Sequence, residues 1–159
     1  MTFFTIGVYG STENEFFQKL IDNNIDTFCD IRQRRGVRGA KYTFVNSHRL
    51  QQKLGEINIK YGHFIGLAPT KDIREFQKKT DRQKGESKSE RLSLSQIFKG
   101  EFENRILNKF NFDEFIKKLN EMGAGRVVLF CVEEKAAACH RSLVAEKIYS
   151  KMNYSIRHL

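Results

Sequence analysis

The 159-residue sequence contains no tryptophan, a single proline and only three cysteines. An odd number of cysteines, without the spacing of a secreted disulfide framework, predicts reduced thiols and a cytoplasmic protein. Long apolar runs are also missing, which argues against a membrane-spanning helix and a membrane partner. The apolar start, MTFFTIGVYGS, has neither a basic leader nor a cleavage site, so we expect a first strand there and not a signal peptide.

Acidic residues are in the minority. The chain has 28 Lys and Arg against 19 Asp and Glu, a net charge of +9. This surplus favours a polyanionic or phosphate-bearing partner, although a basic surface that only aids solubility would look the same. The length suits a single domain, 1–159, with a proper core. Nothing in the sequence indicates the oligomeric state.

Alternating apolar runs and turn residues predict strands at 3–10, 25–31, 59–67, 126–133 and 154–159, and helices at 11–24, 47–58, 70–81, 92–110, 111–123 and 139–152. Ser47 is expected to cap the second helix. The order predicts a three-layer α/β domain, with a mostly parallel sheet of about five strands and flanking helices. Residues 80–91 carry many charges and almost no apolar side chains, so we expect a mobile basic loop there.

Ligands of parallel sheets bind beyond the carboxyl ends of the strands. Three loops of this chain should open on that edge. The first begins at Gly7, which we expect to contact a ligand; the second follows Asp30, and the third follows the strand 126–133.

The loop after the second strand, DIRQRRGVRG, is the most basic part of this edge. Its four arginines lie within seven residues: Arg32, Arg34, Arg35 and Arg38. Arginine suits bidentate contact with phosphate or carboxylate, and such a cluster repels itself without a counter-charge. The loop therefore predicts a site for an anion or a nucleic-acid backbone. The alternative is a solvated basic loop partly neutralised by Asp30 and Glu133.

The last helix opens with Cys139-His140-Arg141. A helix N-terminus attracts anions and lowers the pKa of a thiol, so we expect His140 and Arg141 to bind an anion and Cys139 to be a candidate reactive thiolate. Alternatively, Arg141 pairs with a nearby carboxylate and Cys139 is simply a small buried residue. A C-x5-R loop is missing, which argues against phosphatase chemistry through a cysteinyl phosphate.

Carboxylates near these cations are candidates for acid–base work. Glu133 and Asp30 could orient the arginines or move a proton. Nitrogen and sulfur donors are available on Cys131, Cys139, His140 and His158, but C-x7-C-H lacks the paired spacing of zinc knuckles. We therefore expect no metal and no cofactor.

Several segments together resemble the family known as domain of unknown function 488: FTIGVYGSTENEFFQKLIDNNIDTFCDIR, IKYGHFIGLAPT, VVLFCVEEKAAACHRSLVAEKI and the final IRHL. The resemblance extends in order over nearly the whole chain, and its C-x-E…CHR stretch is specific. Its motif positions are Gly7, Asp30, Arg32, Cys131, Glu133, Cys139, His140, Arg141 and His158. Val8 or Tyr9 stands where the family frequently has a histidine. The resemblance supports the fold and the site but implies no reaction.

We therefore expect the chain to bind an anionic ligand, either a phosphate-bearing small molecule such as a nucleotide or a nucleic acid, at the carboxyl edge of the sheet. If the chain is an enzyme, hydrolysis or transfer on that ligand is the expected reaction. Two alternatives stay open. One is a non-catalytic nucleic-acid-binding module, with aromatic residues between 42 and 64 stacking on bases. The other is a thiol-based redox protein that uses Cys139.

Overall fold

The computed structural model describes residues 1–159 and contains one five-stranded sheet in which every pairing is parallel. Its strands are β1 (Thr2–Ile6), β2 (Thr27–Asp30), β3 (Lys60–His63), β4 (Arg126–Phe130) and β5 (Ile156–His158). Their order is β3-β2-β4-β1-β5, so β4 is central. The predicted α/β class is confirmed, and the strand richest in buried apolar residues occupies the middle, as burial on both faces requires.

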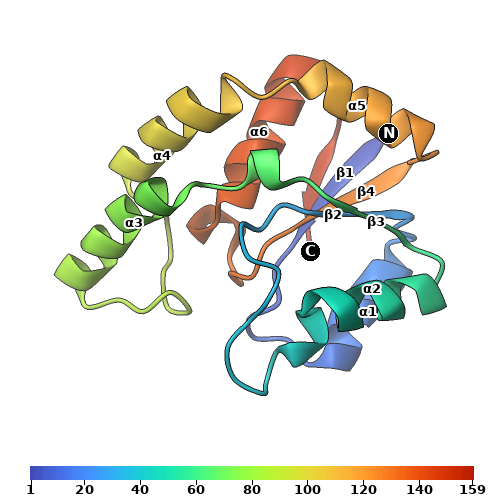
Figure 1. The fold of residues 1–159 in the computed structure, drawn as a ribbon, viewed down its shortest axis with the longest axis horizontal. Helices are drawn as coiled ribbons and strands as arrows, with labels where there is room; N and C mark the ends of the chain where they lie inside the picture. Colours follow the sequence, from blue (N-terminus) through green and yellow to red (C-terminus); the bar gives the residue numbers. More distant parts are fainter.

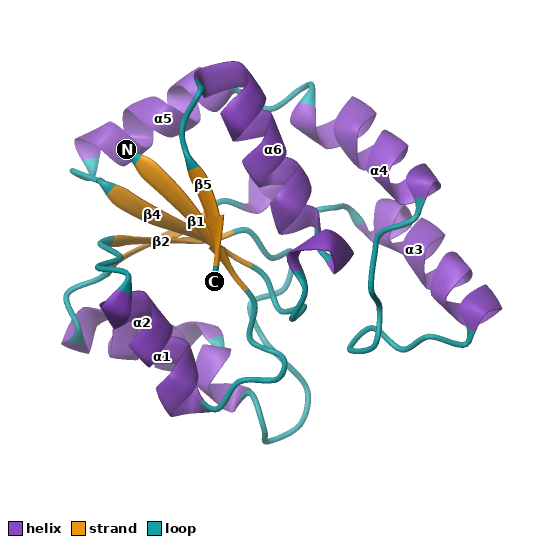
Figure 2. Ribbon diagram, turned by 180° about the vertical axis from the view of Figure 1, so that it is seen from behind, coloured by secondary structure: helices purple, strands orange, loops and turns teal.

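Six α-helices flank the sheet: α1 (Glu13–Asp22), α2 (Ser47–Glu56), α3 (Lys71–Lys84), α4 (Gln96–Phe102), α5 (Phe112–Glu121) and α6 (His140–Met152). Figures 1 and 2 show α1 and α2 on one face of the sheet, and α5 and α6 on the other. The helices α3 and α4 continue this second layer outward beyond α6. No helix combines the length and the apolar character that crossing a bilayer needs.

Each face of the sheet has its own apolar core, and each core contains 18 buried residues. Successive strand residues point to opposite faces, so Phe3 packs in one core and Phe4 in the other. Val127 and Val128 of β4 divide in the same way. Six phenylalanines belong to the core on the α1 side, where Phe16 is in edge contact with Phe28 and Phe130.

The first two helices begin differently from each other. Thr12 caps α1 in a capping box with Glu15, which agrees with the sequence pattern. Ser47 was the expected cap of α2, but this prediction is wrong: the N-cap position is Asn46, and Ser47 is already helical. The Asn46 side chain does not cap the helix either. It accepts the Val37 N–H at 2.8 Å and thereby fixes the basic loop that precedes the helix.

The segment 80–91, expected to be a loop, begins as helix. Helix α3 continues to Lys84 and ends at Gly85, whose φ of 66° lies in the left-handed region that glycine adopts without strain. Asp81 on α3 is buried and forms an ion pair with the equally buried Arg91. Two of the charges that indicated a solvated loop therefore neutralise each other inside the protein.

The predicted helix 92–110 is interrupted. Helix α4 ends at Phe102, and residues Glu103–Leu107 continue as one turn of π-helix. Phe102 is fully buried, and its ring packs against the ring of His140 with centroids 5.5 Å apart. The end of α4 therefore contacts the start of α6, where the candidate site lies.

Candidate functional site

The carboxyl ends of β2 and β4 open into a cleft of about 360 Å³. Residues 32–34 and 36–38, after β2, form one wall. Helices α3 and α4 and the segment between them form the other. Residues 131–133 and His140 lie between the walls. The cleft has the size of many small-molecule sites and lies at the edge where parallel sheets bind ligands.

The cleft is rich in basic side chains, and four of them have a carboxylate partner: Arg32 with Asp30, Lys78 with Glu75, Lys88 with Glu133 and Arg91 with Asp81. Seven of the side chains that line it are basic: Arg32, Arg34, Arg38, Arg74, Lys78, Lys88 and Arg91. Glu133 is the one carboxylate among the lining residues. Cations gathered in a partly enclosed space repel one another, and an anion between them relieves that repulsion.

Four of these cations lie between residues 74 and 91 and were missed by the sequence analysis. Arg74 and Lys78 are four residues apart on α3, so they share one face of the helix, and this spacing was a usable signal. Lys88 and Arg91 lie in the loop after α3. No sequence signal places them at the cleft, because their position depends on how that loop returns to the sheet.

Arg32 is held almost entirely inside the protein. Its Nε donates to Asp30 Oδ1 at 2.8 Å, and its Nη2 donates to Asp30 Oδ2 at 2.7 Å and to the Val45 carbonyl at 3.0 Å. The guanidinium also lies over the Phe130 ring. Its remaining nitrogen, Nη1, is buried and has no hydrogen-bond partner.

Asp30 holds Arg32 and does not have the setting of a free base. Its carboxylate is fully buried and also accepts from the backbone N–H of Arg32 and from the Tyr61 hydroxyl, at 3.1 and 2.9 Å. Burial, followed by the charge of Asp30, raises the pKa of Tyr61 to about 12, so the phenol stays protonated and keeps donating. The two roles predicted for Asp30 are therefore unequal: the geometry favours orienting the arginine.

The other three arginines of the basic loop do not all lie at the cleft. Arg34 and Arg38 are exposed residues that line the cleft. Arg35 is exposed too, but it lies beside the Tyr61 hydroxyl and does not line the cleft. Two of the three therefore have the placement expected of ligand-binding residues.

Arg141 and Gly7 have structural positions and do not line the cleft. The Arg141 guanidinium is buried and donates to the carbonyls of Glu133 and Glu134, the latter at 2.7 Å. Gly7 faces the same loop: a Cβ added there would lie 1.9 Å from the Glu133 carbonyl oxygen. Both residues fix the chain after β4, in place of the ligand contact that the sequence analysis expected.

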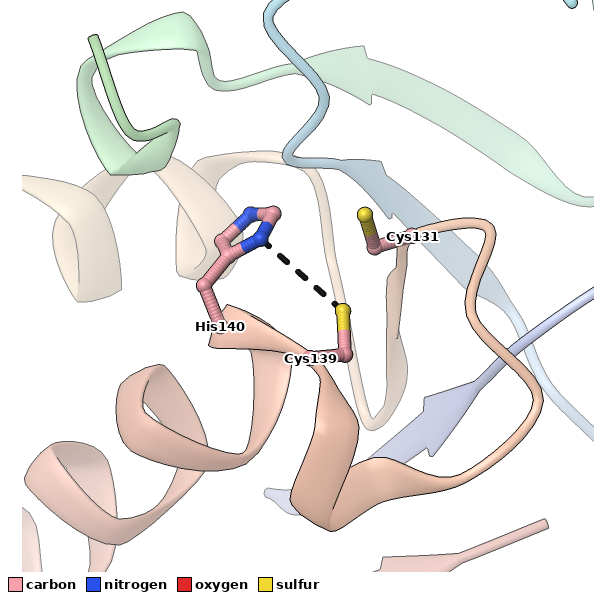
Figure 3. A group of neighbouring side chains, drawn as sticks. All are labelled: Cys131, Cys139 and His140. Carbon is pink, nitrogen blue, oxygen red and sulfur yellow. Dashed lines mark hydrogen bonds between the residues drawn. The ribbon is translucent and has the colours of Figure 1, made fainter. Parts of the chain in front are cut away.

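Behind the cleft, Cys131, Cys139 and His140 form a buried cluster, drawn in Figure 3. Cys131 directly follows β4, Cys139 is the N-cap residue of α6, and His140 is its first helical residue. The Cys139 Sγ lies 3.8 Å from His140 Nδ1, and His140 Nε2 lies 3.0 Å from the Ile31 carbonyl oxygen. Cys131 and His140 line the cleft, whereas Cys139 does not. His158 is outside the cluster, with its Nδ1 2.7 Å from the Thr5 hydroxyl.

The low thiol pKa expected for Cys139 falls on Cys131. A hydrogen bond from Cys139 lowers the pKa of the Cys131 thiol below its ordinary value, against the effect of burial. Burial raises the pKa of Cys139 well above its ordinary value, and the neighbouring Cys131 raises it further. The sequence argument from the helix N-terminus fails because Cys139 is buried and shares its hydrogen bond with a second sulfur.

Glu133 is buried beside cations and thiols. Its Oε1 lies 3.3 Å from Lys88 Nζ, and its Oε2 lies 3.1 Å from Cys131 Sγ. Burial alone would raise the pKa of Glu133, but the Lys88 ammonium and hydrogen bonds from the thiols lower it to about 2. The side chain is therefore ionised at neutral pH and is a weak base, which favours orientation over proton transfer.

The aromatic residues near the basic loop are mostly unavailable for stacking on bases. Phe44 is buried in the core on the α1 side, and Phe64 is packed edge-on against Phe115. Tyr42 contacts the Tyr9 ring, and its hydroxyl accepts the Gly10 N–H.

Comparisons with known proteins give one family. The sequence model described as "Domain of unknown function DUF488" matches residues 12–148. Neither a curated protein nor a solved structure matches the chain significantly.

Proposed function

The chain belongs to the DUF488 family, and from the geometry of its cleft we propose that it binds a phosphate-bearing small molecule, such as a nucleotide or a phosphorylated metabolite. The proposed ligand lies between residues 32–38 and α3, with its phosphate oxygens toward the basic side chains. Arg34 and Arg38 contact it from one wall, and Arg74 and Lys78 from the other.

One observation supports this proposal most directly: Arg32 lines the cleft and has a buried Nη1 without a partner. A buried polar group without a hydrogen bond costs about 1–3 kcal/mol, and more when it is charged. Asp30 fixes the rest of the guanidinium, so the side chain cannot turn to recover that bond within the protein. In the proposed complex, an anionic oxygen of the ligand is the partner of this nitrogen.

The proposal is tested by calorimetric titration with inorganic pyrophosphate. We expect saturable binding of one equivalent, weakened about tenfold by Arg38→Gln or by Arg74→Gln, because each variant removes one charge-assisted contact. Arg157→Gln is the matched control: it removes the same charge from the exposed residue Arg157 on β5, which does not line the cleft. Equal weakening by all three variants would show an effect of overall charge and would refute a cleft site.

Glu133 gives a test in the opposite direction. It is the one carboxylate among the lining residues and holds Lys88 at 3.3 Å. Glu133→Gln removes the repulsion between this carboxylate and a bound anion and releases the lysine, so pyrophosphate should bind several-fold more tightly. Weaker binding by this variant would contradict the proposed position of the phosphate groups.

A nucleic-acid backbone is the competing ligand, because Arg35 and Lys41 are exposed on the same loop outside the cleft. The dependence of affinity on salt separates the two. A single-stranded oligonucleotide loses affinity with a log–log slope of roughly −0.7 for each phosphate neutralised. Oligonucleotide binding with a steep slope, and no competition from pyrophosphate, would identify a nucleic-acid-binding module.

We extend the proposal to hydrolysis or group transfer on the bound anion, because Cys131, Glu133 and His140 border the same cleft. Glu133→Gln should then abolish turnover of a phosphorylated substrate while it preserves or tightens binding. Turnover that survives this substitution would leave Glu133 without a part in the reaction.

A further inference from the structure

The buried cluster of Cys131, Cys139 and His140 has the donor atoms of a metal site. Its two sulfurs and one ring nitrogen all lie within 4.8 Å of one another. Tetrahedral zinc, bonded to sulfur at about 2.3 Å and nitrogen at about 2.0 Å, separates its ligand atoms by about 3.5–3.8 Å. Of these, about 3.5 Å is the sulfur-to-nitrogen separation, and the 3.8 Å between Cys139 Sγ and His140 Nδ1 is close to it. Figure 3 shows the three side chains directed at a common space.

The His140 ring is oriented as a ligand. Its Nε2 lies 3.0 Å from the Ile31 carbonyl oxygen, and a carbonyl can only accept, so Nε2 carries the hydrogen. In the neutral ring this leaves the lone pair on Nδ1, the nitrogen that faces the sulfur. Metal-binding histidines are commonly fixed in this way, with the second ring nitrogen donating to a backbone carbonyl.

We propose that Cys131, Cys139 and His140 bind one thiophilic divalent cation, of which Zn²⁺ is the best match. Two thiolates and an imidazole are soft donors that select Zn²⁺ over Mg²⁺ or Ca²⁺. The two thiolates also neutralise the divalent charge, so the buried complex carries no net charge.

The fourth coordination position of this site faces the cationic cleft. Cys131 and His140 line the cleft, whereas Cys139 lies behind them. Three protein ligands with one open position are the arrangement of catalytic zinc sites, and structural sites have four. A metal ion at this site could coordinate an oxygen of an anion held by the arginines. The ion does not need that anion in order to bind.

The loop from 132 to 138 explains why the C-x7-C-H spacing did not indicate a metal. Zinc knuckles place two cysteines on one tight turn, whereas here a short 3-10 turn at Ala136–Ala138 returns the chain to the end of β4. Arg141 fixes this return by binding the carbonyls of Glu133 and Glu134. The donors thus converge through a folded loop, which a spacing rule does not capture.

Titration of the full chain, reduced and freed of metal with a chelator, tests the proposal. We expect Co²⁺ to give a thiolate-to-cobalt charge-transfer band that saturates at one equivalent, and Zn²⁺ to displace it. Cys131→Ser and Cys139→Ser should each weaken Zn²⁺ binding by more than about 100-fold, because loss of a direct ligand costs more than the roughly 10–100-fold that loss of an outer-shell partner costs. Cys29→Ala is the matched control, because Cys29 is a buried thiol of β2 outside the cluster.

A second measurement on the unmodified chain does not depend on the folding of any variant. Zn²⁺ should slow alkylation of Cys131, the cysteine of the pair that lines the cleft, by at least tenfold, followed by mass spectrometry. A cluster that is only a thiolate–imidazole pair would show no cobalt band and no protection by Zn²⁺, and this result would overturn the proposal. Pyrophosphate binding measured with the chelator present tests the anion cleft separately.

Discussion

The two arginines that the sequence analysis placed together at an anion site have different roles. Each has one buried nitrogen without a hydrogen-bond partner, Nη1 of Arg32 and Nε of Arg141, but Arg32 lines the cleft, whereas Arg141 lies outside it and donates to two backbone carbonyls. The two side chains are about equally buried, so burial alone does not separate them. The acceptors distinguish the two: Arg32 donates chiefly to the Asp30 carboxylate, and Arg141 donates to backbone carbonyls.

Arg141→Lys tests this structural role. A lysine ammonium cannot reach both carbonyls with the planar geometry of the guanidinium, so at least one buried acceptor loses its partner. We expect the free energy of unfolding to fall by about 2–3 kcal/mol, measured by urea denaturation. Arg34→Lys, at an exposed residue of the cleft, should change it by less than about 0.5 kcal/mol. Equal stability of the two variants would show that the carbonyl contacts of Arg141 are dispensable.

Gly7 is a second residue whose requirement is packing. A methyl group at this position would overlap the Glu133 carbonyl oxygen at 1.9 Å, so either β1 or the loop after β4 must move. Gly7→Ala should therefore cost about 3 kcal/mol of stability in the same measurement.

The control for this substitution is Gly55→Ala. Gly55 lies on α2, and nothing comes within 4 Å of its added Cβ. Alanine there should stabilise the protein by roughly 0.5–1 kcal/mol, because glycine is the weaker helix former. If Gly7→Ala is as harmless as this control, the close approach of the two loops does not exist in solution.

Among the elements, the segment from α3 to α4 differs most from its sequence-based description. The Asp81–Arg91 ion pair connects the last turn of α3 to the returning chain, and the Leu94 N–H donates to the Ala137 carbonyl at 3.1 Å. These contacts anchor the end of a segment that was expected to be mobile. They also place Lys88 and Arg91 at the cleft.

Hydrogen exchange tests this anchoring. The amide of Leu94 should be protected in the unmodified chain and should exchange markedly faster in Asp81→Asn, which removes the nearest carboxylate from the buried Arg91 and leaves it only Glu133 at 3.8 Å. Breaking a buried pair typically costs about 3 kcal/mol or more. Asp72→Asn, which breaks the exposed pair between Asp72 and Arg105, should change little. An unprotected Leu94 amide would support the mobile loop instead.

The elements were predictable where one residue type dominates a short stretch. The apolar run predicts the position of β4, and the capping residues predict the start of α1. Helix α3 could not be followed past residue 81, because Asp81 looks solvated until Arg91, ten residues away, is known to be its partner. The break after Phe102 was hidden for a similar reason: the ring that Phe102 meets belongs to His140.

For the whole molecule, the sequence showed the sign of the charge but not its distribution. The net charge of +9 is equally consistent with an anionic partner and with a basic surface that only aids solubility. The fold gathers seven cations around one cleft: three from the loop after β2, two from α3, and two from the segment 80–91 that was expected to be a solvated loop. The carboxyl edge of the sheet was predictable from strand order alone, whereas the second wall of the cleft depends on how α3 and α4 pack.

Ligand binding should therefore be visible in the stability of the whole chain. A ligand at 100 times its Kd adds about 2.7 kcal/mol to the free energy of unfolding when it binds only the folded state. Saturating pyrophosphate should raise the Tm of the unmodified chain and of Arg157→Gln by similar amounts, measured by scanning calorimetry at fixed ionic strength. The shift should be reduced in Arg38→Gln at the same ligand concentration. Identical shifts in all three would point to binding outside the cleft.

The central position of β4 also constrains the order in which the protein can assemble on the ribosome. Strands β1 and β2 are both made early, yet they never touch: each pairs with β4, through Phe3 and Val127 on one side and Thr27 and Val127 on the other. Until about residue 130 has left the exit tunnel, the two N-terminal strands expose edges with no native neighbour. Strands β2 and β3 can pair earlier, but β1 cannot join the sheet until β4 has been synthesised, so the complete sheet forms only when most of the chain is available.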